Sequence, residues 1–140
     1  MSYFHVWFLT KYSKAVLEGD VERKVKDYFL EVADNKNYNI LEMETNKDHV
    51  HMLLEAKDRE ELAGMVRVLK SVSAKKILLD TPHLRVGNAR CSEGYHRRKP
   101  VEVRGNFWAR CYGCREVSKN EIETVKTYIR DQKKTVMVGG

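Results

Sequence analysis

The chain has 140 residues, and its 26 Lys+Arg against 20 Asp+Glu give a formal net charge of +6. This length suits a single domain spanning residues 1–140, and a hydrophobic content of 42% argues against a disordered chain. No apolar run approaches the ~18 residues of a membrane span, and three cysteines, which cannot all pair within one chain, favour a reducing cytoplasm over secretion.

The first part of the chain predicts a strand, a helix and a β-hairpin. Residues 3–10 are dense in aromatic and β-branched side chains, as is typical of a strand. A helix begins at Asp20, keeps its apolar residues at helical spacing, and ends in the polar cluster 35–39. Residues 38–45 and 49–56 predict two further strands, joined by a short turn.

The second part predicts a capped helix, a basic segment and another strand. Asp58 with Glu61 three residues later is typical of a helix N-terminus, and Pro82 marks the end of that helix. Residues 83–105 are irregular and basic, and residues 106–117 contain a candidate fourth strand.

The last predicted element is a helix that begins at the capping pair Ser118 and Glu121 and continues to about Lys134. The predicted order is therefore β-α-β-β-α-β followed by a C-terminal helix. This order indicates an α+β fold with a ferredoxin-like, split-βαβ antiparallel sheet and two helices on one of its faces. The additional C-terminal helix is not needed by that unit and is free to carry function.

The charge is unevenly distributed along the chain. Residues 1–57 have a net charge of −2, whereas residues 58–140 have a net charge of +8. A basic half suits a polyanionic partner such as nucleic acid, although a solvated basic surface is the alternative. The candidate DNA contacts are Lys70, Lys75, Lys76, Arg97, Arg98 and Lys99.

Two histidines stand one residue apart on the third predicted strand. Side chains alternate between the faces of a strand, so one face receives His49, His51 and Leu53. The other face, which we expect to pack under the helices, receives Val50, Met52 and Leu54. On the open side of the sheet the two imidazoles could hold one metal ion, or they could be partly buried and bonded to neighbours. His5, on the first strand, is expected in the core rather than at a DNA contact.

Tyr128 and Gln132 lie four residues apart on the last predicted helix, so they should stack on one face. A phenol can attack a phosphodiester, but it is a weak nucleophile at neutral pH and needs assistance. A divalent cation on His49 and His51 could supply it, with the Gln132 carbonyl as a third ligand. The alternative is a tyrosine that packs at the edge of the helix stripe and a solvated glutamine.

These two motifs resemble those of a known family. The Asp-His-Val-His-Met-Leu-Leu strand at 48–54 and the Tyr-Ile-x-x-Gln helix at 128–132 look like the paired motifs of HUH single-tyrosine transposases. These are the TnpA-like enzymes of small bacterial and archaeal insertion sequences. The likeness extends through residues 5–12, 69–74 and 107–112 in the expected order.

The resemblance implies an enzyme that nicks and rejoins single-stranded DNA at element ends, after recognising a subterminal hairpin, through a 5′-phosphotyrosine link. It implies Tyr128 as the catalytic nucleophile and His49, His51 and Gln132 as ligands of Mg²⁺ or Mn²⁺. Two imidazoles are soft ligands for Mg²⁺, so Mn²⁺ should bind better. It also implies a homodimer, no nucleotide cofactor, and action in the prokaryotic cytoplasm, associated with the nucleoid when bound to DNA.

Other interpretations stay open at this point. The chain could be a domesticated, repeat-associated tyrosine transposase, or a non-catalytic nucleic-acid-binding module of the same fold. A smaller possibility is a zinc site formed by Cys91, His96, Cys111 and Cys114, whose spacing falls within the usual range. A regular strand through Cys111 and Cys114 would forbid that site, because the two thiols would then face opposite sides.

Overall fold

The computed structural model describes residues 1–11, 15–81 and 107–132. Its strands are β1 (Ser2–Leu9), β2 (Asn39–Asn46), β3 (His49–Ala56) and β4 (Gly113–Val117). Its helices are α1 (Gly19–Lys36), α2 (Arg59–Asp80) and α4 (Ile122–Arg130), the last preceded by the 3₁₀ turn η5 (Lys119–Glu121). The predicted α+β class is confirmed, and the elements of the described residues follow the predicted order.

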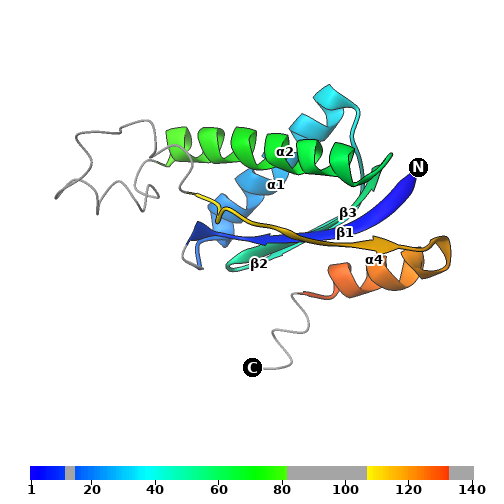
Figure 1. Ribbon diagram of the computed structural model, residues 1–140. Helices are drawn as coiled ribbons and strands as arrows, with labels where there is room; N and C mark the ends of the chain where they lie inside the picture. Colours follow the sequence, from blue (N-terminus) through cyan, green and yellow to red (C-terminus); the bar gives the residue numbers. More distant parts are fainter. Residues whose placement is uncertain (12–14, 82–106, 133–140) are drawn as a thin grey trace.

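The strands form one antiparallel sheet in the order β2-β3-β1-β4. Figure 1 shows α1 and α2 on one side of this sheet and α4 on the other. None of the described helices has the length and apolar character needed to cross a membrane. The sheet therefore separates two layers, and the chemistry-bearing residues can be sorted by the layer that they face.

The main core lies between the sheet and the pair of helices α1 and α2. Alternate residues of the two central strands are fully buried there, as the period of a strand requires. They are Phe4, Val6 and Phe8 of β1 and Val50, Met52 and Leu54 of β3. Burying each large apolar side chain stabilises the fold by about 1.5–3 kcal/mol. The predicted core face of the histidine strand is thus confirmed.

Local signals set the ends of the helices. The Asp58 carboxylate accepts a hydrogen bond from the Glu61 N–H at 2.9 Å, which caps α2. The Ser118 N–H donates to the Glu121 carboxylate at 3.2 Å, which completes the predicted capping box before α4. Asn37 ends α1 in the left-handed conformation, with φ of 61°, which asparagine tolerates better than most residues.

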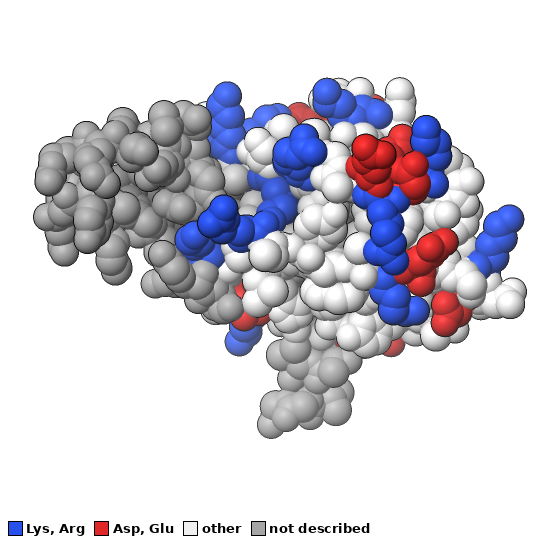
Figure 2. Space-filling model, in the orientation of Figure 1, with Lys and Arg blue, Asp and Glu red and all other residues white. Residues whose placement is uncertain are grey.

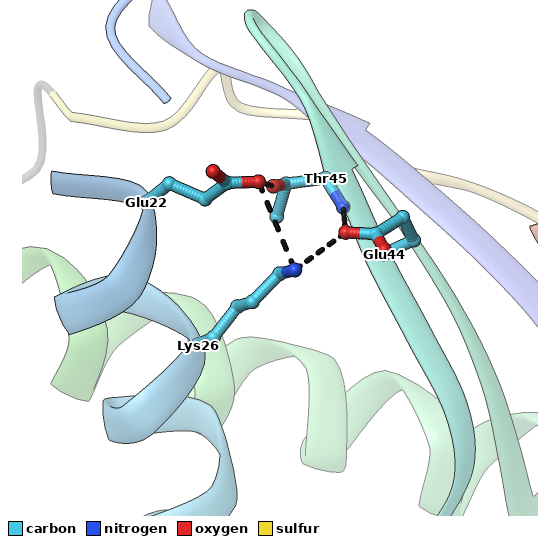
Figure 3. Close-up of polar contacts among 4 residues, drawn as sticks. All are labelled: Glu22, Lys26, Glu44 and Thr45. Atoms are coloured by element: carbon cyan, nitrogen blue, oxygen red, sulfur yellow. Dashed lines mark hydrogen bonds and ion pairs between the residues drawn. The ribbon is translucent and has the colours of Figure 1, made fainter. Parts of the chain in front are cut away.

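A polar network joins α1 to the edge strand β2 (Figure 3). The Lys26 ammonium lies between the carboxylates of Glu22, at 3.7 Å, and Glu44. The Thr45 hydroxyl donates to Glu22, and the Thr45 N–H donates to Glu44 at 3.0 Å. Because these side chains are largely shielded from water, their pairing positions β2 against the helix layer better than an exposed ion pair would.

The segment that leads into β4 is fastened to α2. The Trp108 indole N–H donates to the Ser73 hydroxyl at 2.9 Å, and Phe8 packs edge-on against the Trp108 ring. The Lys70 ammonium donates to the main-chain carbonyl of Ala109 at 2.7 Å and also bonds the two following carbonyls, at 3.1 and 3.4 Å. Burial lowers the Lys70 pKa. Through these contacts Lys70 holds the segment 109–111 against α2.

We expect Lys70→Met to destabilise the fold by about 1–3 kcal/mol, because three carbonyls lose a charged donor in a partly buried position. Urea unfolding followed by circular dichroism measures the loss, with Lys75→Met, an exposed position on the same helix, as the matched control. Unchanged stability combined with weaker DNA binding would instead favour the predicted DNA contact for Lys70.

The predicted fourth strand is present within residues 106–117 as β4. The regular strand begins at Gly113. Before it, Trp108 forms an isolated antiparallel bridge with Thr10, and the Lys70 ammonium of α2 binds the carbonyls of residues 109–111. The predicted end of the last helix near Lys134 and the basic segment 83–105 lie outside the described residues.

Candidate active site

Two histidines from adjacent central strands meet on the face of the sheet opposite α1 and α2. Strands β1 and β3 pair so that His5 lies opposite Leu53, and Trp7 opposite His51. The His5 Nε2 and the His51 Nδ1 are 3.0 Å apart, a hydrogen-bond distance, and both side chains are buried. His5 is buried, as a core position requires, but it lies on the face opposite the main core and against a candidate metal ligand.

His49 lies one strand repeat from His51, with the two ring centres 5.0 Å apart. Its Nδ1 is 2.8 Å from the Asp48 carboxylate, and its side chain is partly exposed. In both histidines, therefore, Nδ1 has a neighbouring partner, and Nε2 is the nitrogen left for another ligand.

Burial keeps the two inner histidines neutral. The pKa of His51 is lowered to about 4, mainly by burial and to a smaller extent by the adjacent His5 and His49. Burial also lowers the pKa of His5 to about 4, with a smaller contribution from the positive charge of Arg115. A neutral imidazole is the form that binds metal ions.

Helix α4 places Tyr128 beside these histidines. The Tyr128 ring centre is 5.7 Å from that of His5 and 5.9 Å from that of His51, both in edge-on geometry. Tyr128 as a whole is 53% exposed, and it lines the opening of a pocket rather than the core. The sequence-predicted nucleophile and one of the predicted ligands are thus brought together.

A second, smaller apolar cluster holds α4 in this position. Leu53 of β3 and Val117 of β4 are buried against Val125 and Ile129 of the helix. The prediction that the histidine face is the open side of the sheet is therefore wrong in part. The apolar residues of α4 must be buried, and they pack against Leu53, which lies on the same face of β3 as the histidines. Helix α4 therefore covers part of that face.

Gln132, the predicted third ligand, lies one turn beyond Tyr128 and is 9% exposed. Its amide nitrogen donates to the Tyr128 main-chain carbonyl at 3.1 Å, which continues the end of the helix. The amide oxygen is the atom that a metal would use, and its role as a ligand stays a prediction.

A pocket of about 530 Å³ opens beside the tyrosine. Its lining includes Trp7 of β1, Arg115 of β4 and Thr124 of α4, together with the two inner histidines and Tyr128. An aromatic ring, a guanidinium and a phenol at one opening suit a nucleotide, whose base can stack and whose phosphate can pair. The sequence reasoning missed these three residues. For Trp7 the sequence did hold a signal: side chains alternate along β1, so Trp7 shares a face with His5 and not with the core residues Phe4, Val6 and Phe8.

Gly113 allows Trp7 to lie in that pocket. The two residues are paired across β1 and β4, and a Cβ on Gly113 would lie 2.3 Å from the indole ring. We expect Gly113→Ala to displace the indole and to destabilise the fold by about 1–3 kcal/mol. Thermal unfolding and the Trp fluorescence spectrum would measure both effects, and an unchanged spectrum would contradict the predicted displacement.

The donor set at the site suits a divalent cation. His49 and His51 leave their Nε2 atoms available, and Gln132 could add an oxygen. Within the described part of the chain, however, no three His, Cys, Asp or Glu side chains are grouped as around a metal ion. A metal held only by His49, His51 and Gln132 would keep coordination positions for phosphate and water.

The predicted DNA contacts on α2 lie on the opposite side of the sheet from this site (Figure 1). Lys75 is exposed there, and Lys76 pairs with Glu31 of α1. Residues 97–99, the other basic candidates, lie outside the described residues.

The positive charge of the chain lies largely outside the described residues. Those residues contain 17 Lys+Arg and 18 Asp+Glu, a net charge of −1, against +6 for the whole chain. On the face drawn in Figure 2, most acidic side chains lie on the right, among basic ones, whereas basic side chains predominate on the left of the described part. The described charge on this face is therefore mixed and not uniformly basic.

Two of the four residues of the zinc alternative, Cys91 and His96, lie outside the described residues. Cys111 is exposed and precedes β4, whereas Cys114 lies within that strand. The Arg59 guanidinium donates to the Cys114 sulfur at 3.1 Å. Both thiols are free, and the zinc site stays untested.

Comparison with known proteins gives consistent matches. The family model described as "Transposase IS200 like" matches residues 1–132. The ISDra2 transposase TnpA of Deinococcus radiodurans is 29% identical over 129 residues, covering 92% of this chain and 82% of that protein. The transposase for insertion sequence element IS200 of Salmonella typhimurium is 28% identical, covering 92% and 75%.

Solved structures show the same fold. A crystal structure of a candidate transposase from Deinococcus radiodurans superposes with a TM-score of 0.64 at 27% identity, covering 93% of this chain and 89% of that one. A REP-associated tyrosine transposase bound to a REP hairpin gives a TM-score of 0.61 at 9% identity, covering 96% and 67%.

Proposed function

Since the chain belongs to the IS200-like transposase family, we propose that it cleaves and rejoins single-stranded DNA at insertion-sequence ends, with Tyr128 as the nucleophile. The observation that carries the proposal is the position of Tyr128, an exposed phenol whose ring lies edge-on against two buried, neutral histidines. A tyrosine with only a packing role would not need an accessible hydroxyl beside such groups.

In the proposed step, the Tyr128 oxygen attacks a backbone phosphorus of the DNA. A phenol–phosphorus bond forms, the bond from phosphorus to the 3′ oxygen breaks, and the phenolic proton ends on the released 3′ hydroxyl. The product is a 5′-phosphotyrosine link. Because one ester replaces another, the reverse attack by a 3′ hydroxyl can rejoin DNA without ATP or another nucleotide cofactor.

The residues proposed to hold Mg²⁺ or Mn²⁺ are His49, His51 and Gln132. Such a cation would polarise a non-bridging phosphate oxygen and reduce the repulsion met by the attacking phenol. His49 and His51 both come from β3, so the spacing of their imidazole nitrogens is set by the strand itself. The pocket with Trp7 and Arg115 would receive the nucleotide beside the scissile phosphate.

The proposal extends to partners. Recognition of a subterminal DNA hairpin is proposed because a REP-associated transposase with this fold is bound to a hairpin. We also propose a homodimer, acting in the cytoplasm of a prokaryotic cell and associated with the nucleoid while bound to DNA. The basic segment 83–105 and its residues Arg97, Arg98 and Lys99 are the proposed phosphate contacts.

The test is covalent capture of DNA. The full chain is incubated with a single-stranded oligonucleotide carrying its own element end and hairpin, together with Mn²⁺ or Mg²⁺, and run on a denaturing gel. We expect an SDS-resistant protein–DNA adduct and a released fragment with a free 3′ hydroxyl. Tight hairpin binding with no adduct under any metal condition would overturn the catalytic proposal and favour a non-catalytic binding module.

A domesticated, repeat-associated transposase is the second candidate, because the REP-associated enzyme shares the fold. The same assay distinguishes it, because such a protein would form its adduct with a repeat hairpin rather than with an element end.

A further inference from the structure

We infer that His5 is a positioning residue, which holds the His51 ring in the tautomer that presents its Nε2 atom to a metal ion. The inference rests on the proposed function, since it concerns how this chain prepares its proposed metal site. It starts from the 3.0 Å contact between His5 Nε2 and His51 Nδ1.

The chemistry of imidazole makes the direction of this hydrogen bond decisive. A neutral ring carries one proton, and only the other nitrogen has a lone pair for a metal. If His51 binds through Nε2, its proton must be on Nδ1, and that N–H needs an acceptor. The Nε2 lone pair of a neutral His5 lies at the right distance to accept it.

The reverse arrangement would disable the site. If His5 donated its own Nε2 proton, the His51 proton would have to lie on Nε2, where it blocks metal binding. The two rings therefore act as a pair, in which the tautomer of His5 determines that of His51. In this pairing the His5 proton must lie on Nδ1.

The neighbouring ligand is arranged in the same way by a different group. His49 has its Nδ1 2.8 Å from the Asp48 carboxylate, so its N–H also has an acceptor, and its Nε2 is also left for a metal. Each of the two proposed histidine ligands thus has one supporting partner, a carboxylate for His49 and an imidazole for His51. Supporting hydrogen bonds of this kind fix ring orientation, and their loss typically weakens metal affinity 10–100-fold.

The packing favours a positioning role for His5. Its ring is buried, tilted against Trp7 at 5.0 Å and edge-on to Tyr128 at 5.7 Å. These neighbours hold the ring on the His51 side of the sheet. Leucine could fill much of this space but could not accept a hydrogen bond, whereas glutamine could do both.

The experiment compares wild type, His5→Leu and His5→Gln, each as the full chain. Long-range ¹⁵N–¹H NMR of the metal-free proteins reports which nitrogen of His51 carries the proton. Titration with Mn²⁺ alone, followed by electron paramagnetic resonance, reports affinity without any DNA cleavage. Thermal unfolding confirms that each variant is folded, and the His49 tautomer, set by Asp48, is the internal control.

We expect wild-type His51 to carry its proton on Nδ1. In His5→Leu the proton should shift to Nε2 and the Mn²⁺ affinity should fall about 10–100-fold, while the His49 tautomer stays the same. His5→Gln should restore most of the affinity. An Nε2 proton on wild-type His51, or wild-type affinity in His5→Leu, would overturn the inference.

The outcomes also separate this inference from the proposed function. If the wild type does not bind Mn²⁺, the proposed metal is contradicted, whereas the NMR tautomer still decides the role of His5. If the wild type binds Mn²⁺ and both variants bind it equally well, the metal proposal stands and the inference about His5 fails.

Discussion

Tyr128→Phe should abolish the covalent adduct with single-stranded DNA, lowering the cleavage rate to below about one thousandth of the wild-type rate. The substitution removes only the nucleophilic oxygen. The ring stays, so its edge-on contacts with His5 and His51 persist, and a half-exposed hydroxyl contributes little to folding. We therefore expect normal stability and normal hairpin affinity together with a complete loss of the SDS-resistant species.

Tyr28→Phe is the matched control for this experiment. Tyr28 lies on α1, on the other side of the sheet, where its hydroxyl donates to Asp80. The control removes the same atom from a comparable ring and should form the adduct at the wild-type rate. An adduct that persists in Tyr128→Phe would mean that another group attacks the DNA, and peptide mapping of the adduct would then identify it.

His49→Ala should lower Mn²⁺ affinity by more than about 100-fold, and adduct formation should fall with it at any fixed, subsaturating metal concentration. His49 is the better histidine to remove, because its side chain is partly exposed whereas His51 is buried. Loss of the exposed ring should leave the melting temperature nearly unchanged. Calorimetric Mn²⁺ titration and the adduct assay together measure the effect.

The His49 experiment has two controls, one that removes the metal and one that changes a residue outside the site. Wild type treated with EDTA should behave like His49→Ala. Tyr28→Phe, which changes a residue on the other side of the sheet, should behave like untreated wild type. If His49→Ala binds Mn²⁺ as the wild type does and still forms the adduct, His49 is not a ligand.

Local sequence signals predicted most of the fold. The bounds of the histidine strand, 49–56, match β3, and the caps at Asp58 and Ser118 form as expected. These features depend on residues a few positions apart, because strand alternation and capping act at short range. The same alternation correctly put Leu53 on the histidine face.

Long-range contacts account for what the sequence did not predict. The hydrogen bond between His5 and His51 joins residues 46 positions apart, and it needs the pairing register of β1 with β3. The sequence predicts Lys70 as a DNA contact, yet its ammonium binds the main-chain carbonyls of residues 109–111. Neither arrangement has a signature within one element.

The structure also shows which residues do not carry the net positive charge. The basic half of the sequence predicted a DNA-facing half of the molecule, but the described residues have a net charge of −1. Salt-dependent affinity would therefore come chiefly from the basic residues of 83–105 and the last residues of the chain. Removing the charges at Arg97, Arg98 and Lys99 would reduce affinity without touching the chemistry of the proposed site.

β3 is a central strand, and the side chains on both of its faces are packed or proposed to function. Val50, Met52 and Leu54 fill the main core, while His51 and Leu53 on the other side carry a proposed ligand and the anchor of α4. Most substitutions along this strand would disturb folding and chemistry together, which leaves evolution little room to tune one without the other. Variation in DNA target is more easily accommodated elsewhere, in segments whose changes do not pass through this strand.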